Sequence, residues 1–255
     1  MRGDALKLLD KIAIVTGGGC GVGKAMSQLF AQEGATVVVS DIDSESAKAV
    51  MEEIKAQGGK ALGIKTDVTK DQEVAQLVED TARRFGRLDI MINNAGVNSP
   101  VSWKEMTKEE WDRVMDINLW GVFLGCRAAG LAMMKQKSGK IINLSSLVAK
   151  TGSIFSGMNY SASKAGVSCL TINFAKVLAP HGINVNAIAP GPLDTAFHKT
   201  TTKEQREAII KSFPLPLGAF GEAKDAAEVA LFLASDAARI ITGEIIDVNG
   251  GMFMD

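Results

Sequence analysis

The sequence predicts an α/β fold: a single domain, residues 1–255, built on a seven-stranded, parallel, doubly wound sheet with helices on both faces. Short β-branched runs alternate with longer helical patterns along nearly the whole chain, and this alternation is typical of repeated strand–helix–strand units. The β-branched runs are apolar on both sides of the pleat, as expected for parallel strands that are covered on both faces. A glycine cluster separates the first strand from the first helix, a position typical of doubly wound folds.

The individual elements follow from the same patterns. We expect strands at residues 12–16, 36–40, 61–66, 88–93, 140–144, 183–189 and 244–248. We expect helices at residues 21–33, 44–57, 71–85, 103–136, 160–180 and 225–235. Residues 191–224 fall outside the alternation and contain three prolines. A long connection of this kind is typical of a lid or binding loop, and the alternative is a structured surface excursion.

Composition limits the classes of function. The chain is 46% hydrophobic and 22% charged, with a net charge of −1, so no basic excess indicates a nucleic acid or an anionic membrane as partner. No apolar run approaches the roughly 20 residues of a membrane span. The chain has three cysteines, an odd number, and their spacing matches neither a metal site nor a disulfide framework. We therefore expect reduced thiols in a cytoplasmic protein without a metal site.

The glycine cluster has the features of a dinucleotide-binding loop. It lies between the first strand and the first helix, where glycines let the backbone turn tightly and approach a pyrophosphate. The helix N-terminus then offers free N–H groups to the anion. A P-loop is excluded, because Gly23 and Lys24 are followed by Ala25. The candidate contacts are Gly17, Gly19, Cys20, Gly21, Val22 and Gly23.

Asp41 is a candidate for recognising the cofactor ribose. It ends the second strand, 18 residues after Gly23, where a carboxylate can accept hydrogen bonds from both ribose hydroxyls and repel a 2′-phosphate. Ile42 follows it and Cys20 stands in the loop, so nothing basic compensates. This pattern favours NAD over NADP. The alternative is that Asp41 caps the helix that begins near Ser44.

The chain contains one tyrosine, Tyr160, four residues before Lys164. On a helix these two positions lie on one face. A phenol has a pKa of about 10, and a neighbouring cation can lower it by roughly 1–3 units. The pair is therefore a candidate proton-transfer centre.

Taken in order, several short motifs resemble the classical short-chain dehydrogenase/reductase family over residues 10–251. The motifs are Thr16-Gly17-x-x-x-Gly21-x-Gly23, Asp67-Val68, Asn93-Asn94-Ala95-Gly96, Asn118, Ser145-Ser146, Tyr160-x-x-x-Lys164 and Pro190-Gly191. The resemblance implies a Rossmann-like sheet with strand order 3-2-1-4-5-6-7. It also implies a homotetramer.

The resemblance implies a role for each of four catalytic residues. Tyr160 is the expected acid/base, and Lys164 is expected to lower its pKa and to contact the nicotinamide ribose. Ser146 is expected to hydrogen-bond the substrate oxygen, and alternation along the strand sends Ser145 to the other side. Asn118 is expected to hold a water that connects Lys164 to solvent.

The resemblance also assigns cofactor contacts beyond the glycine loop. These contacts include Tyr160 and Lys164. The others are Asp41, Ile42, Asp67, Val68, Asn94, Ala95, Gly96, Pro190, Gly191 and Thr195.

The leading interpretation is an NAD-dependent oxidoreductase that interconverts a secondary alcohol and a ketone. A second enzyme interpretation is the reduction of a 3-oxoacyl thioester on an acyl carrier protein or coenzyme A. A third hypothesis, a non-catalytic NAD-binding sensor, predicts the loss of a catalytic residue, and Ser146, Tyr160 and Lys164 are all present.

Overall fold

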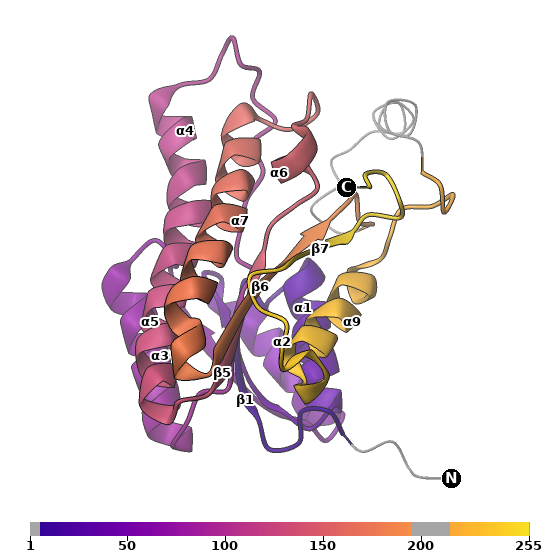
Figure 1. The fold of residues 1–255 in the computed structure, drawn as a ribbon. Helices are drawn as coiled ribbons and strands as arrows, with labels where there is room; N and C mark the ends of the chain where they lie inside the picture. Colours follow the sequence, from indigo (N-terminus) through magenta and orange to yellow (C-terminus); the bar gives the residue numbers. More distant parts are fainter. Residues whose placement is uncertain (1–5, 195–214, 255) are drawn as a thin grey trace.

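The computed structural model describes residues 6–194 and 215–254. Seven parallel strands form one sheet in the order β3-β2-β1-β4-β5-β6-β7, which confirms the predicted fold (Figure 1). The strands are β1 (Ile12–Thr16), β2 (Thr36–Asp41), β3 (Lys60–Lys65), β4 (Ile90–Asn93), β5 (Gly139–Leu144), β6 (Ile183–Pro190) and β7 (Ile245–Val248).

Helices cover both faces of the sheet (Figure 1). One layer contains α1 (Gly21–Gln32), α2 (Ser44–Ala56) and α9 (Ala223–Ala234). The opposite layer contains α3 (Asp71–Phe85), α5 (Gly121–Gln136) and α7 (Met158–Leu178). The short helices α4 (Lys108–Met115) and α6 (Val148–Thr151) lie beyond the carboxyl edge of the sheet, beside the N-terminal part of α7 (Figure 1).

The central strands are buried because they divide their side chains between two cores. Along β1, Ala13 and Val15 pack under α1 and α9, while Ile14 packs under α5 on the other face. Such two-sided burial requires the continuous apolar runs that the sequence contains. The edge strands differ, since every residue of β7 is only partly buried.

The long helix predicted at residues 103–136 begins later than expected and is interrupted. Its N-cap is Thr107, whose hydroxyl accepts a hydrogen bond from the Glu110 amide at 3.2 Å. A π-helical turn, η1 (Asp116–Trp120), then joins α4 to α5. Such turns insert one residue into the helical ladder and are frequent at functional sites.

Taken together, α4, η1 and α5 form a helical stretch, Lys108–Gln136, that is long and apolar enough to cross a membrane by length and composition. However, half of its most apolar window is buried within the structure. Its buried side packs against the sheet and α7, which is the arrangement of a core helix.

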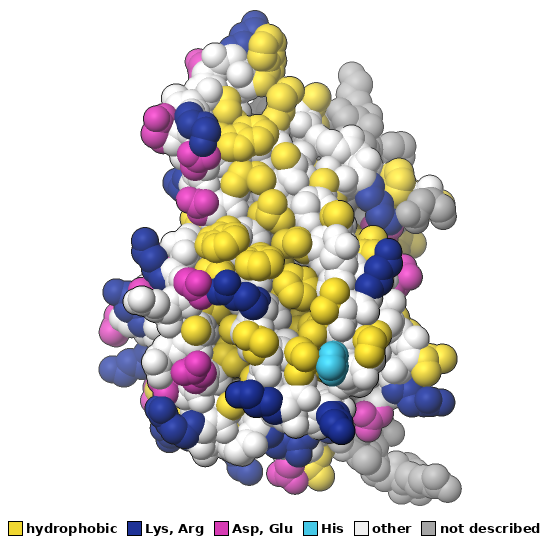
Figure 2. Space-filling model, turned by 60° about the vertical axis from the view of Figure 1, so that its left-hand side comes forward, with side chains coloured by type: hydrophobic (Ala, Val, Ile, Leu, Met, Phe, Trp, Pro, Cys, Tyr) yellow, Lys and Arg dark blue, Asp and Glu magenta, His cyan; other side chains and the backbone are white. Residues whose placement is uncertain are grey.

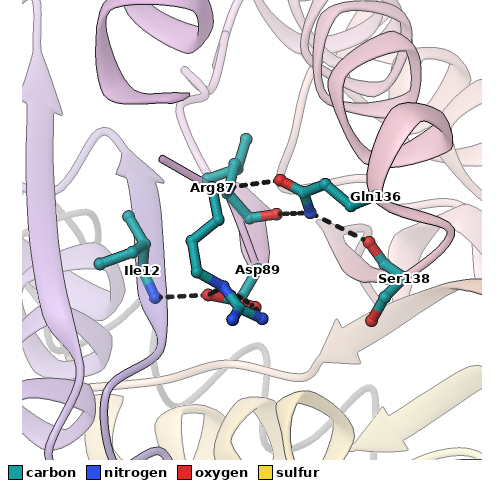
Figure 3. A network of polar contacts seen from close by, with 6 residues as sticks. Ile12, Arg87, Asp89, Gln136 and Ser138 are labelled. Carbon is teal, nitrogen blue, oxygen red and sulfur yellow. Dashed lines mark hydrogen bonds and ion pairs between the residues drawn. The ribbon is translucent and has the colours of Figure 1, made fainter. Parts of the chain in front are cut away.

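A polar network fixes the amino end of β4 (Figure 3). The buried carboxylate of Asp89 accepts a hydrogen bond from the Ile12 amide at 2.9 Å and pairs with the Arg87 guanidinium. The Gln136 side chain closes a reciprocal pair with the Leu88 backbone, at 2.8 Å for each bond. These contacts set β4 beside β1 and tie it to the end of α5, so the register of the central strands is fixed at the edge opposite the predicted site.

The predicted lid, residues 191–224, lies mostly outside the described residues, as does Thr195. Its two ends are anchored. The Gly191 amide donates to the Val248 carbonyl at 2.9 Å, and Leu193 forms a parallel bridge with Gly221.

Candidate active site

The predicted site residues gather at the carboxyl edge of the sheet, around the ends of β1, β2, β4, β5 and β6. β1 pairs with β2 on one side and with β4 on the other. Strands β2 and β3 are therefore added on one side of β1, and β4 to β7 are added on the other. In open α/β sheets, ligands bind at this switch point.

The glycine loop is closely packed. Gly17 and Gly21 have φ angles of +62° and +53°, a region that favours glycine. A Cβ on Gly23 would lie 2.1 Å from the Gly17 carbonyl oxygen, and one on Gly17 would lie 2.8 Å from the Ala95 Cα. The Nδ2 of the Asn94 side chain donates to the Gly17 carbonyl at 3.0 Å and so fixes the loop against the end of β4.

The N-terminus of α1 fits an anion. Its N-cap, Cys20, forms no side-chain cap, and its first turn has no acidic residue. Burial and the neighbouring Asp41 carboxylate raise the pKa of the Cys20 thiol, so it is not a reactive thiolate. The free N–H groups of this turn and the glycine backbone together suit a pyrophosphate, as a dinucleotide requires.

Asp41 lies beside this loop and does not cap α2. Its Oδ2 accepts from the Gly19 amide at 2.9 Å, and its Oδ1 accepts from the Asp43 amide at 3.1 Å. The N-cap of α2 is Asp43, which accepts from the Glu45 amide. The capping alternative for Asp41 is therefore wrong. In the described part of the chain, no cation forms an ion pair with Asp41.

The remaining cofactor candidates line the same edge. Val68 packs against Gly121, where a Cβ would lie 3.0 Å from Val68 Cγ2. A Cβ on Gly96 would lie 3.2 Å from Asn118 Oδ1 and 3.5 Å from Lys164 Nζ. The structure thus brings the loop after β4 against two of the four predicted catalytic residues. Other candidates at this edge are Val22, Ile42, Asp67, Ala95 and Pro190.

Tyr160 and Lys164 lie in the first two turns of α7 and are both buried, at 9% and 4% exposure. Lys164 Nζ lies 5.8 Å from the centroid of the Tyr160 ring and donates to the Leu144 carbonyl at 2.6 Å. The Tyr160 phenol hydrogen-bonds the Ser146 hydroxyl. Three of the predicted catalytic side chains therefore meet beside the end of β5.

The expected lowering of the tyrosine pKa does not occur in this structure. Burial raises the pKa of Tyr160 to about 12, and the hydrogen bond with Ser146 offsets only part of this rise. Burial also lowers the pKa of Lys164 to about 8. The cause is shared, because a low-dielectric surrounding disfavours both phenolate and ammonium. The phenol is therefore protonated at neutral pH, and burial makes it a weaker acid than an exposed phenol.

The two serines after β5 face different ways, as predicted. The Ser145 hydroxyl bonds the Ser168 hydroxyl at 2.8 Å and the Lys164 carbonyl at 3.0 Å, so it is used in attaching α7 to the strand. Ser146 instead reaches the phenol of Tyr160.

Asn118 lies in the π-helical turn and is fully buried. Its Oδ1 accepts from the Val97 amide at 2.8 Å, and its Nδ2 donates to the Val97 carbonyl at 2.9 Å. The side chain therefore holds the loop that follows β4. The expected water contact is not tested by this structure.

A buried polar network below the site escaped the sequence analysis. The Asn143 carboxamide accepts from Asn93 at 2.8 Å and donates to the Thr171 hydroxyl at 3.0 Å, so it joins β4, β5 and α7. Cys126 of α5 contacts both amides at 3.4 Å. Asn143 could have indicated this network, because it lies within an otherwise apolar strand and a buried amide needs hydrogen-bond partners.

The pKa of Lys164 gives a testable prediction about stability. The folded value of about 8 lies below the unfolded value of about 10.4, so the buried ammonium opposes folding below pH 8. That cost fades as pH rises from about 8 to 10. Relative to Lys164→Met, which has no titrating group, the wild type should gain about 2 kcal/mol over this range. Urea unfolding of both proteins at the two pH values measures it; a difference that does not change with pH contradicts the burial effect.

Comparisons with known proteins agree with this site. A family model described as enoyl-(acyl carrier protein) reductase matches residues 18–253. The 3-oxoacyl-[acyl-carrier-protein] reductase FabG of Thermotoga maritima is 38% identical over 247 residues, which cover 97% of this chain and 99% of the relative. The enzyme of the same name from Staphylococcus aureus is 42% identical over 247 residues, covering 96% and 99%.

A comparison with solved structures indicates the same family. A short-chain type dehydrogenase/reductase from Mycobacterium marinum superposes with a TM-score of 0.93 at 35% identity and covers 99% of each chain. Fold, site and comparisons agree: the chain is an oxidoreductase that binds a nicotinamide cofactor, and it belongs to the short-chain dehydrogenase/reductase family.

Proposed function

We propose that the protein reduces the 3-oxo group of an acyl thioester, carried on acyl carrier protein or coenzyme A, to a 3-hydroxyl. The observation that carries the proposal is the meeting of Ser146, Tyr160 and Lys164 beside the end of β5, next to the glycine that follows β4. The names of the relatives from Thermotoga maritima and Staphylococcus aureus support the thioester as substrate. They favour this interpretation over the general secondary alcohol or ketone that the sequence analysis placed first.

The proposed chemistry assigns a separate task to each residue. When bound beside these residues, a reduced nicotinamide would supply the hydride that the carbonyl carbon needs. The Ser146 hydroxyl and the Tyr160 phenol hydrogen-bond the carbonyl oxygen, where negative charge develops. Tyr160 then donates its proton to that oxygen. Lys164, with a pKa of about 8, is mostly protonated at pH 7 and can return a proton to the phenolate.

The proposed cofactor is NADH. The Asp41 carboxylate lies at the end of β2, 2.9 Å from the Gly19 amide of the glycine loop. A 2′-phosphate near this carboxylate would meet a like charge, whereas ribose hydroxyls would find an acceptor. The partly buried position of Asp41 strengthens this discrimination, since screening by water is reduced.

The proposed assembly is a homotetramer. Figure 2 shows a broad hydrophobic area on the helical face formed by α4, α5 and α7. Exposed apolar side chains here include Trp120 at the end of η1, Leu131 of α5, and Ile172 and Val177 of α7, the last at 65%. Apolar patches of this kind are typical of protein interfaces. We further propose a cytoplasmic location, in keeping with three free cysteines, and that residues 191–224 cover the substrate.

The function is tested by following the oxidation of NADH with acetoacetyl-coenzyme A and with a simple ketone of similar length. The thioester should give the higher kcat/KM. Tyr160→Phe should lower kcat by roughly 10²–10⁴-fold, because only the proton donor is lost, and NADH affinity should change little. No other tyrosine can replace it. A phenylalanine variant that turns over normally, or a thioester no better than the ketone, contradicts the proposal.

The cofactor proposal is tested by Asp41→Ala. The variant should bind NADH more weakly and should use NADPH better relative to NADH, because both the hydroxyl acceptor and the repelling charge are removed. The matched control is Asp43→Asn, which keeps an acceptor at the neighbouring N-cap of α2 and should leave the preference unchanged. If the wild type already prefers NADPH by a wide margin, the argument from Asp41 is wrong.

A further inference from the structure

The residue directly before Tyr160 is a fully buried asparagine. Both ends of the Asn159 side chain are used: Oδ1 accepts from the Tyr160 amide at 2.9 Å, and Nδ2 donates to the Glu110 carbonyl of α4 at 3.1 Å. The N-cap of α7 is Gly157, which has no side chain to cap the helix. Asn159 therefore satisfies an amide of the first turn that a capping residue would otherwise bind.

The other side of the Tyr160 backbone is held in the same way. The Ser163 hydroxyl donates to the Tyr160 carbonyl at 2.7 Å and accepts from Asn118 Nδ2 at 3.1 Å. Asn118 in turn holds the backbone of Val97. Side chains that are themselves fully buried thus bond both the N–H and the C=O group of Tyr160.

The residues around Asn159 leave room for its side-chain carboxamide and hold its hydrogen-bond partner in place. A Cβ on Gly157 would lie 2.4 Å from Asn159 Oδ1 and 2.4 Å from the Ser99 carbonyl oxygen, so only glycine fits there. The anchor on α4 is also fixed, because Thr107 caps that helix and the Glu110 carboxylate forms two bonds with Arg113 at 2.8 Å. The bond from Asn159 therefore joins α7 to a well-held element.

We propose that Asn159 is a positioning residue that sets the rotation of the first turn of α7, and thereby keeps the Tyr160 phenol within reach of Ser146 and the substrate oxygen. The inference rests on the proposed role of Tyr160. The Tyr160 amide also donates to the Gly157 carbonyl at 3.1 Å, so loss of Asn159 leaves the helix in place and frees its first turn. A misplacement of about 1 Å can lower a rate by about 10²-fold.

The proposal is tested with Asn159→Ala and Asn159→Asp. The aspartate variant keeps an acceptor for the Tyr160 amide and loses the donor to Glu110, so it separates the two bonds. The matched control is Thr171→Val, which removes another buried hydrogen-bonding group of α7, between Asn143 and the Val167 carbonyl, farther along the helix. Kinetics at saturating NADH and thioester give kcat and KM separately, and titration of NADH gives its dissociation constant.

A second measurement does not depend on activity. Because the chain has one tyrosine, labelling with ¹⁵N-tyrosine gives a single amide signal, and its hydrogen exchange reports the first turn of α7 directly. In Asn159→Ala this exchange should quicken by at least about tenfold, since a buried bond to the amide is lost. It should stay unchanged in Thr171→Val.

We expect Asn159→Ala to lower kcat about 10–100-fold, with KM and the NADH dissociation constant within about twofold of wild type. Asn159→Asp should be intermediate. The inference is overturned if kcat in Asn159→Ala stays near the wild-type value, or if Thr171→Val loses kcat equally. It is also overturned if Tyr160 exchange does not change. Should the alanine variant fail to fold, Asn159→Asp is judged by kcat alone, which must fall below that of Thr171→Val for the inference to stand. An active Tyr160→Phe protein would instead contradict the proposed function.

Discussion

The burial of one phenol and one amine side by side governs the chemistry of this site. Water would stabilise the charged forms of Tyr160 and Lys164, and its exclusion raises the pKa of the first and lowers that of the second. The result is a neutral proton donor bonded to Ser146, with a lysine that titrates near physiological pH behind it. This arrangement places a protonated phenol and a titrating amine where the proposed substrate oxygen would bind.

The rest of the fold keeps that pair buried and correctly placed. The sheet register is set at its amino edge by the network around Asp89 (Figure 3). At the carboxyl edge, Asn118 ties the π-helical turn to the loop after β4. Each connection is a buried polar group with its partners satisfied, and such networks specify one geometry because a half-satisfied alternative is costly.

Much of the fold could be predicted because its elements depend on local patterns. Helix α3 begins and ends at the predicted residues, since its apolar positions repeat clearly and Gly86 adopts the left-handed conformation at its C-terminus. The strand order could be predicted only through the family resemblance. The π-helical turn was missed, because a shift of one hydrogen bond leaves no mark on composition. The late start at Lys108 depends on Thr107 as a cap, which competes with other polar residues nearby.

The sequence predicted which residues meet at the candidate site, but it predicted the direction of the Tyr160 pKa shift wrongly. The sequence indicates which residues meet, but the direction of a pKa shift depends on the balance between burial and neighbouring charge, and only the structure gives burial. Asn159 was missed for a related reason: its role comes from the carbonyl of Glu110, which is 49 residues away in the sequence.

The most direct measurement is the ionisation of Tyr160, the chain's single tyrosine, followed in the cofactor-free protein by the ring signal of ¹³C-labelled tyrosine. With a pKa of about 12, the phenol should remain protonated at pH 10, where a free tyrosine is about half ionised. A phenol that ionises at or below pH 8 in the folded protein would contradict the account.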